Sequence, residues 1–108
     1  MPDDHAEYMR QTLRLANRVV RFNPGQIVAT PGALVALVFN DIKPMDLVLR
    51  HVFGDFGDVS IEDRAANEAA ISDGDRILSA YTLADATTIW VITEADRAST
   101  CLLTPDDY

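Results

Sequence analysis

The chain has 108 residues, 48% hydrophobic and 24% charged, a composition that excludes a disordered chain and predicts a single domain over residues 1–108 with one core. Nine basic against seventeen acidic residues give a net charge of −8. Because affinity for polyphosphate comes largely from Lys and Arg, direct binding to nucleic acid or to an anionic membrane is disfavoured, whereas such a surface suits a basic protein partner.

The first predicted element is an amphipathic helix within residues 1–24, which Asp3 or Asp4 caps and which runs to about Phe22. Apolar residues recur along it at spacings of three and four, which places on one face Met9, Leu13, Ala16 and Val20. A row of arginines follows the same helix: Arg10, Arg14, Arg18 and Arg21. This row is either a solvated helix face or a docking stripe for an acidic protein or a phosphate backbone.

Residues 25–75 are predicted to be mostly helical, after a short strand at 26–29 that suits a sheet edge. Thr30 then has the side chain of a helix N-cap, and Pro31 suits the first helical position. The helix that follows, 31–39, is apolar on all sides. It is therefore expected to be buried in a monomer or, alternatively, to form a contact between copies in an oligomer.

Two more helices are predicted in this section, on either side of a loop at 54–58 that reads Gly-Asp-Phe-Gly-Asp. The first spans 44–53, with inward positions at Met45, Val48, Leu49 and Val52. The second spans 61–71 and ends at the residues 72–74. Its small residues allow close packing: Ala65, Ala66, Ala69 and Ala70.

Residues 76–108 are predicted to form a β-meander, because three runs rich in β-branched and aromatic residues alternate with short polar breaks. The breaks at 84–87 and 94–98 are short enough for hairpins, so the strands are expected to be antiparallel. Alternation along the runs groups Ile77 with Ser79, Tyr81 and Leu83, groups Ile89 with Val91 and Thr93, and separates Thr100 and Leu102 from Cys101 and Leu103. The predicted fold class is α+β, a three- to four-stranded antiparallel sheet covered by about four helices.

The sequence predicts a cytoplasmic protein. No apolar run approaches the roughly 20 residues that cross a bilayer, and the acidic start lacks the layout of a secretory signal. The one cysteine, Cys101, allows no internal disulfide and fits a reducing compartment. In an apolar strand with no base beside it, Cys101 is expected to be inert.

No metal and no cofactor are predicted. The two histidines, His5 and His51, have no metal-binding spacing, and no phosphate-cradling glycine motif occurs. The carboxylates of Asp55, Asp58 and Asp63 could hold a hard cation, but their spacing differs from that of an EF-hand loop.

A set of polar residues near the predicted strand ends is a candidate for catalysis: His51, Asp55, Asp58, Asn67, Arg76, Ser79, Tyr81, Thr93, Glu94, Asp96 and Arg97. A metal-free ribonuclease or toxin, of barnase-like or RelE-like architecture, needs a base, an acid and a cation, and those residue types are found in His51, Glu94, Arg76 and Arg97. The structural alternatives are that His51 bonds the carbonyls at its helix end and that Glu94, Asp96 and Arg97 cap their own hairpin loop.

Several segments together resemble a family of small bacterial proteins that are described as plasmid-related and occur on mobile elements. The segments are GQIVATPGAL at 25–34, RHVFGDFGD at 50–58, AAN at 65–67, RILSAYTL at 76–83, IWVITEADRAST at 89–100, and the ending LL-P-D-Y within 102–108. The family commonly has Trp at Phe56 and Gly at Ala86. The resemblance implies a mobile-element setting and supplies no functional residue.

The favoured function is therefore a non-enzymatic accessory protein of a mobile element that binds a protein partner. Inhibition of a host defence nucleoprotein complex, of the anti-CRISPR or anti-restriction type, fits the size and the negative charge. The expected binding residues are Asp55, Phe56, Asp58, Glu62, Asp63, Asp106 and Asp107, because carboxylates of this kind can face a basic groove. The metal-independent nuclease stays as the alternative, and a homo-oligomer stays open.

Overall fold

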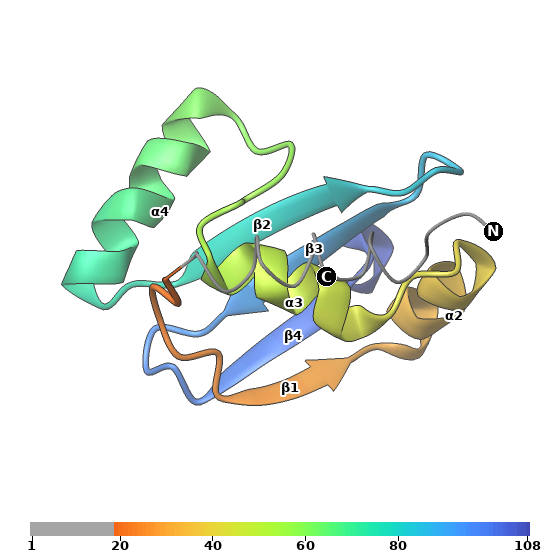
Figure 1. The fold of residues 1–108 in the computed structure, drawn as a ribbon, viewed down its shortest axis with the longest axis horizontal. Coiled ribbons are helices and arrows are strands. Elements are labelled where there is room, and N and C mark those ends of the chain that lie inside the picture. Colours follow the sequence, from red (N-terminus) through yellow and green to blue (C-terminus); the bar gives the residue numbers. More distant parts are fainter. Residues whose placement is uncertain (1–18) are drawn as a thin grey trace, which may run out of the picture.

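The computed structural model describes residues 19–108, which form a four-stranded sheet with helices packed on it (Figure 1). The elements in chain order are β1 (Gln26–Ala29), α2 (Pro31–Phe39), α3 (Pro44–Val52), α4 (Ile61–Asp73), β2 (Ile77–Thr82), β3 (Thr88–Thr93), β4 (Ser99–Leu103) and a short 3₁₀ helix, η1 (Pro105–Asp107). The α+β class and the C-terminal antiparallel meander are confirmed.

The sheet is mixed, which corrects the prediction of a fully antiparallel one. Its strand order is β1-β4-β3-β2, and β1 pairs with β4 in parallel. The amide of Gln26 donates to the carbonyl of Ala98 at 3.0 Å, and that of Thr30 donates to Leu102 at 2.9 Å. The prediction had placed 26–29 correctly at an edge, but no sequence pattern gives the direction in which an edge strand runs.

The predicted N-terminal helix lies mostly outside the described residues, including its Met9 face and its first three arginines. Its predicted end is wrong, because Val19 to Phe22 are not helical. Instead, the Arg21 amide donates to the carbonyl of Val52 at 2.8 Å, and the Arg21 side chain forms an ion pair with Glu68. Phe22 is buried against the core.

One face of the sheet carries the hydrophobic core. Register pairs Tyr81 with Ile89 and Val91 with Leu102, so the buried side chains of neighbouring strands meet on that face. Helix α3 lies across it, with α2 beside one end (Figure 1). The helices add to this core the side chains of Ala33, Leu37, Leu47, Val48 and Val52.

Burial of the helices differs from the sequence expectations in three ways. Only one side of α2 is buried, because Ala33 and Leu37 face the core while the opposite side chains are exposed. In α3 the buried positions include Leu47 and His51, whereas Met45 is exposed. In α4 only Asn67 and Ala70 are buried, so the predicted close packing of four alanines is wrong.

Helix α4 protects the free edge of β2. The Asn67 side chain accepts from the amide of Leu78 at 3.1 Å and donates to the carbonyl of the same residue at 2.7 Å. Farther along the edge, the Asp58 amide donates to the carbonyl of Ala80 at 2.7 Å, and the Ala80 amide donates to Phe56. Backbone groups that would otherwise pair with another chain are therefore satisfied within the molecule.

Within residues 19–108, no helix has the length and apolar character needed to span a membrane.

Candidate functional site

A chain of hydrogen bonds runs through the core from α3 to the sheet and begins at His51, which has no exposed surface. Its Nδ1 lies 2.6 Å from Ser79 Oγ, and its Nε2 lies 2.9 Å from Thr93 Oγ1. Thr93 Oγ1 lies 2.6 Å from Thr100 Oγ1, which donates to the carbonyl of Pro24 at 2.7 Å. These bonds tie α3 to β2, β3 and β4 and to the segment before β1.

The last hydrogen bond of this series, from Thr100 to the carbonyl of Pro24, fixes the tautomer of His51. A carbonyl only accepts, so the proton of Thr100 points at Pro24, and Thr93 must donate to Thr100. Thr93 has then used its proton and accepts from His51, which places the ring proton on Nε2. Nδ1 is left as the acceptor for the hydroxyl of Ser79.

The surroundings of His51 keep its imidazole neutral. Burial, and secondarily the positive charge of Arg97, lower its pKa from 6.5 to about 3. The Phe22 ring packs edge-on at 5.0 Å between ring centroids, and Phe56 lies on another side at 6.5 Å. A histidine enclosed in this way is uncharged at neutral pH and has no path to a solvent-borne substrate.

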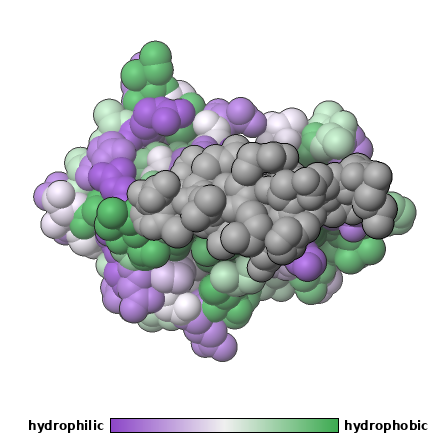
Figure 2. Space-filling model, viewed as in Figure 1, coloured by the Kyte–Doolittle hydropathy of each residue, from purple (hydrophilic) through white to green (hydrophobic). Residues whose placement is uncertain are grey.

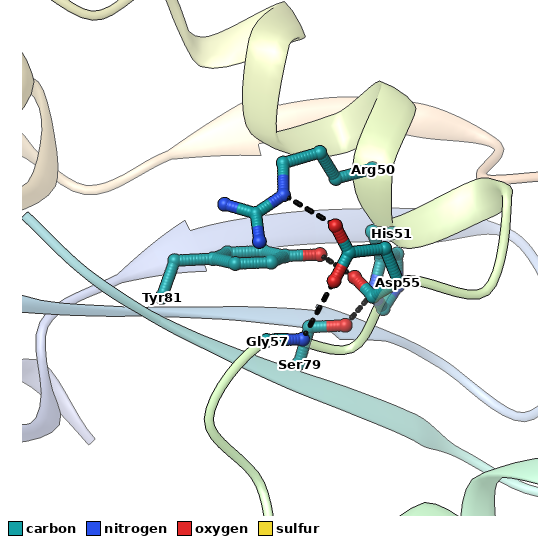
Figure 3. Close-up of polar contacts among 6 residues, drawn as sticks. All are labelled: Arg50, His51, Asp55, Gly57, Ser79 and Tyr81. Atoms are coloured by element: carbon teal, nitrogen blue, oxygen red, sulfur yellow. Dashed lines mark hydrogen bonds and ion pairs between the residues drawn. The ribbon is translucent and has the colours of Figure 1, made fainter. Parts of the chain in front are cut away.

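A second polar group lies next to the first, where α3 meets β2 (Figure 3). Arg50 Nε donates to Asp55 Oδ2 at 2.7 Å, and its guanidinium lies 4.4 Å from the centroid of the Tyr81 ring. The Tyr81 hydroxyl donates to the backbone carbonyl of Asp55 at 2.6 Å, and Asp55 Oδ1 accepts from the Gly57 amide. Burial raises the pKa of Tyr81. The contacts hold the 54–58 loop against the sheet.

The remaining residues of the predicted catalytic set serve turns and termini. Arg97 donates to the carbonyls of Asp75 at 2.7 Å and Ala70 at 2.9 Å, so it ties the β3–β4 turn to the end of α4. It also reaches the carbonyl of Glu94 in its own loop at 3.2 Å. Arg76 donates to the Tyr108 hydroxyl at 3.0 Å. Asp96 caps the amide of Ala98, which confirms the loop-capping alternative for that residue.

These positions do not form an open site that includes His51. The Phe22 ring contacts both residues: the Arg97 guanidinium lies 5.8 Å from its centroid, and the His51 ring packs against it at 5.0 Å between centroids. Both nitrogens of His51 are occupied by hydroxyl groups of the core. For His51 and an arginine to act on the same phosphate, the core would have to open, since catalytic groups must reach the reacting atoms. The geometry therefore gives the nuclease alternative no support.

Three of the predicted binding residues have internal roles. Phe56 is fully buried, so it cannot contact a partner. Asp55 is held by Arg50. Asp107 accepts from the hydroxyls of Thr30 and Thr104, at 2.6 and 2.9 Å, and these bonds lower its pKa. Asp107 thereby fastens the C-terminus to the start of α2.

The other four predicted binding residues are exposed: Asp58, Glu62, Asp63 and Asp106. Three of them surround the start of α4, where Ser60 caps the helix by accepting from the Asp63 amide at 3.0 Å. Between them lies Ile61, with 82% of its surface exposed. The sequence pattern did not single out Ile61, because its exposure depends on which side of α4 packs against the sheet. Figure 2 shows hydrophobic surface standing beside hydrophilic surface at this end of the molecule (top).

The described residues offer little for metal or thiol chemistry. Within 19–108, no three His, Cys, Asp or Glu side chains gather as a metal site would require. Cys101 is partly buried, and burial raises the pKa of its thiol. A raised pKa makes the nucleophilic thiolate scarcer at neutral pH.

Residues 19–108 thus define an α+β protein with a four-stranded mixed sheet, a closed polar chain in its core and an acidic surface. Comparisons of the chain with protein-family models, curated proteins and solved structures find no match. The mobile-element setting implied by the sequence motifs stays a prediction.

Proposed function

We propose that this protein is a small, non-enzymatic accessory factor that docks onto a basic protein partner. The observation that carries the proposal is Ile61, an apolar side chain 82% exposed and flanked in the chain by the exposed carboxylates of Asp58, Glu62 and Asp63. Interfaces commonly combine an apolar anchor that is desolvated on binding with a charged rim that selects the partner. The start of α4 has that composition.

The distribution of charge also supports docking onto a basic partner. Residues 1–18 contain three acidic and three basic residues, so the whole net charge of −8 lies in residues 19–108. Two ion pairs form among the described residues, Arg21–Glu68 and Arg50–Asp55. Most carboxylates in residues 19–108 are therefore exposed and in no ion pair with another described residue. A field of this kind attracts a positively charged surface.

The proposed partner is a protein surface that normally binds nucleic acid, because such surfaces are rich in Lys and Arg. In the mobile-element setting, the partner is a host defence nucleoprotein complex, and the bound protein would act as its anti-CRISPR or anti-restriction inhibitor. Its carboxylates would compete with phosphate groups for the same cations.

The test is capture of a partner by the tagged, full-length protein from a bacterial lysate treated with nuclease. We expect one stoichiometric partner, and we expect Ile61→Ser to weaken its capture at least tenfold. The double variant Glu62→Lys/Asp63→Lys should abolish capture, because it reverses the rim charge.

A matched control lies at the opposite end of the same helix. Asp73→Lys/Asp75→Lys changes the net charge by the same amount and involves residues that are also exposed. We expect this variant to retain capture. Equal loss with both double variants, or no loss with either, would contradict docking through the start of α4. Circular dichroism of each variant excludes unfolding as the cause.

A further inference from the structure

Helix α2 presents an unusual surface for an acidic protein. Leu34, Val35, Val38 and Phe39 lie on its outward side, and the last two are 78% and 81% exposed. The helix contains no charged residue. Figure 2 shows hydrophobic surface at the end of the molecule that α2 occupies (right). The largest apolar patch on a soluble monomer is often a functional surface.

A hollow lies beside this patch, between the end of α2 and the start of α3. It has a volume of about 370 Å³ and is lined by Leu37, Val38, Asp41, Ile42, Lys43 and Asp46. The floor is apolar, and charged groups of both signs stand at the rim. Phe39 follows Val38 in the chain but does not line the hollow, and its side chain is largely exposed. The molecule therefore carries both an exposed aromatic side chain and a hollow that can receive one.

We propose that α2 is the interface of a symmetric homodimer, in which Phe39 of each copy enters the hollow of the other. A twofold axis requires self-complementary surfaces, and a projecting side chain beside a matching hollow meets that requirement. The rim adds reciprocal ion pairs, because Lys43 of one copy can face Asp41 or Asp46 of the other. This inference does not depend on the docking surface at α4.

The absence of charge on α2 decides where a second copy can approach, and the small number of exposed side chains decides how tightly it binds. Two chains of net charge −8 repel each other, so they can approach most readily at the uncharged α2. The outward side of α2 exposes Leu34, Val35, Val38 and Phe39, far fewer than the roughly 20–30 residues a side of a standard interface. The expected dimer is therefore weak, with a dissociation constant in the micromolar range.

Sedimentation velocity of the full chain over a wide range of micromolar concentrations tests the dimer. We expect reversible, concentration-dependent dimerisation that strengthens from 50 to 500 mM NaCl, because salt screens the repulsion between like-charged copies. Phe39→Ala should weaken the dimer at least tenfold, and Val38→Asp should abolish it. Ile61→Ser, which removes another exposed apolar side chain, should leave the dimer unchanged.

Other outcomes would overturn the proposal. A monomer at every concentration, or a dimer that survives Val38→Asp, would remove α2 as its interface. A lower unfolding temperature of dilute, monomeric Phe39→Ala would mean that the chain covers this face itself, because alanine favours the helix. The two proposals fail separately, because Val38→Asp should still capture the basic partner, whereas Glu62→Lys/Asp63→Lys should still dimerise.

Discussion

At the scale of single residues, His51 couples folding to pH. Its pKa is 6.5 when solvated and about 3 in the folded protein, so the unfolded chain binds the proton more readily. The stability that neutral His51 contributes is fully present above pH 6.5. It is lost as the pH falls towards 3, by about 1.4 kcal/mol per pH unit.

We expect the free energy of unfolding, measured with urea, to fall by about 1.2 kcal/mol between pH 6 and pH 5 through this group. The His51→Gln variant should be less stable at neutral pH and should lose that part of the slope. Nitrogen chemical shifts should show a neutral ring with its proton on Nε2 across the same range. A ring that titrates near pH 6.5 in the folded protein would contradict the enclosed hydrogen-bond chain.

The buried hydrogen bonds that join His51 to Ser79 and Thr93 could be predicted from the sequence only in part. Strand alternation correctly placed Ser79 on the face shared with Ile77 and Tyr81, and Thr93 with Val91. Those inward hydroxyls indicated that the core needed a polar partner. The sequence could not identify His51 as that partner, because the contact joins residues 28 and 42 positions apart in the chain.

A second residue-scale effect concerns the turn between β2 and β3. Ala86 has a φ of 72°, a left-handed conformation that is strained for any residue with a Cβ. The family resemblance had indicated glycine as the common residue there. We expect Ala86→Gly to raise the free energy of unfolding by about 0.5–1 kcal/mol. Ala84→Gly, in the same turn without a positive φ, should give no gain, and an equal gain in both variants would exclude backbone strain as the cause.

At the scale of elements, α4 stabilises the sheet through one side chain. Asn67→Ala removes both bonds to the backbone of Leu78 and leaves the amide and carbonyl of that residue without partners. We expect a loss of about 1–3 kcal/mol in the free energy of unfolding, together with faster exchange of the Leu78 amide proton. The exposed neighbour Ala69→Ser should cost less than about 0.5 kcal/mol.

The variant Asn67→Asp separates the two hydrogen bonds that Asn67→Ala removes together. A carboxylate can still accept from the Leu78 amide, but it cannot donate to the Leu78 carbonyl. We therefore expect Leu78 to remain more protected than in Asn67→Ala while stability is still reduced. Equal stability of Asn67→Asp and the unmodified protein would contradict the two-bond arrangement.

Elements were predicted well where local chemistry determines them. Helix α2 has the predicted bounds because Thr30 accepts from the Ala33 amide and Pro31 starts the helix. Helix α4 ends at Gly74, within the predicted terminus at 72–74, although it extends to Asp73 rather than to Ile71. The parallel pairing of β1 and the one-sided burial of α2 depend on contacts between segments far apart in the chain. Local composition does not encode those contacts.

At the scale of the whole molecule, the buried and exposed polar groups have different roles. The enclosed groups around His51 and Tyr81 connect helices to strands, and the exposed carboxylates remain available to a partner. Under the proposed docking, binding and folding therefore use different polar groups. The same charge opposes self-association, which is why the two proposed contacts should respond to salt in opposite directions.

The most direct measurement of the central proposal is retention of the captured partner as NaCl is raised from 50 to 500 mM. Docking of carboxylates onto a basic surface predicts that retention falls steeply, while Glu62→Lys/Asp63→Lys captures nothing at either concentration. Dimerisation of the free protein should strengthen over the same range. Retention that stays constant or rises with salt would contradict electrostatic docking at the start of α4.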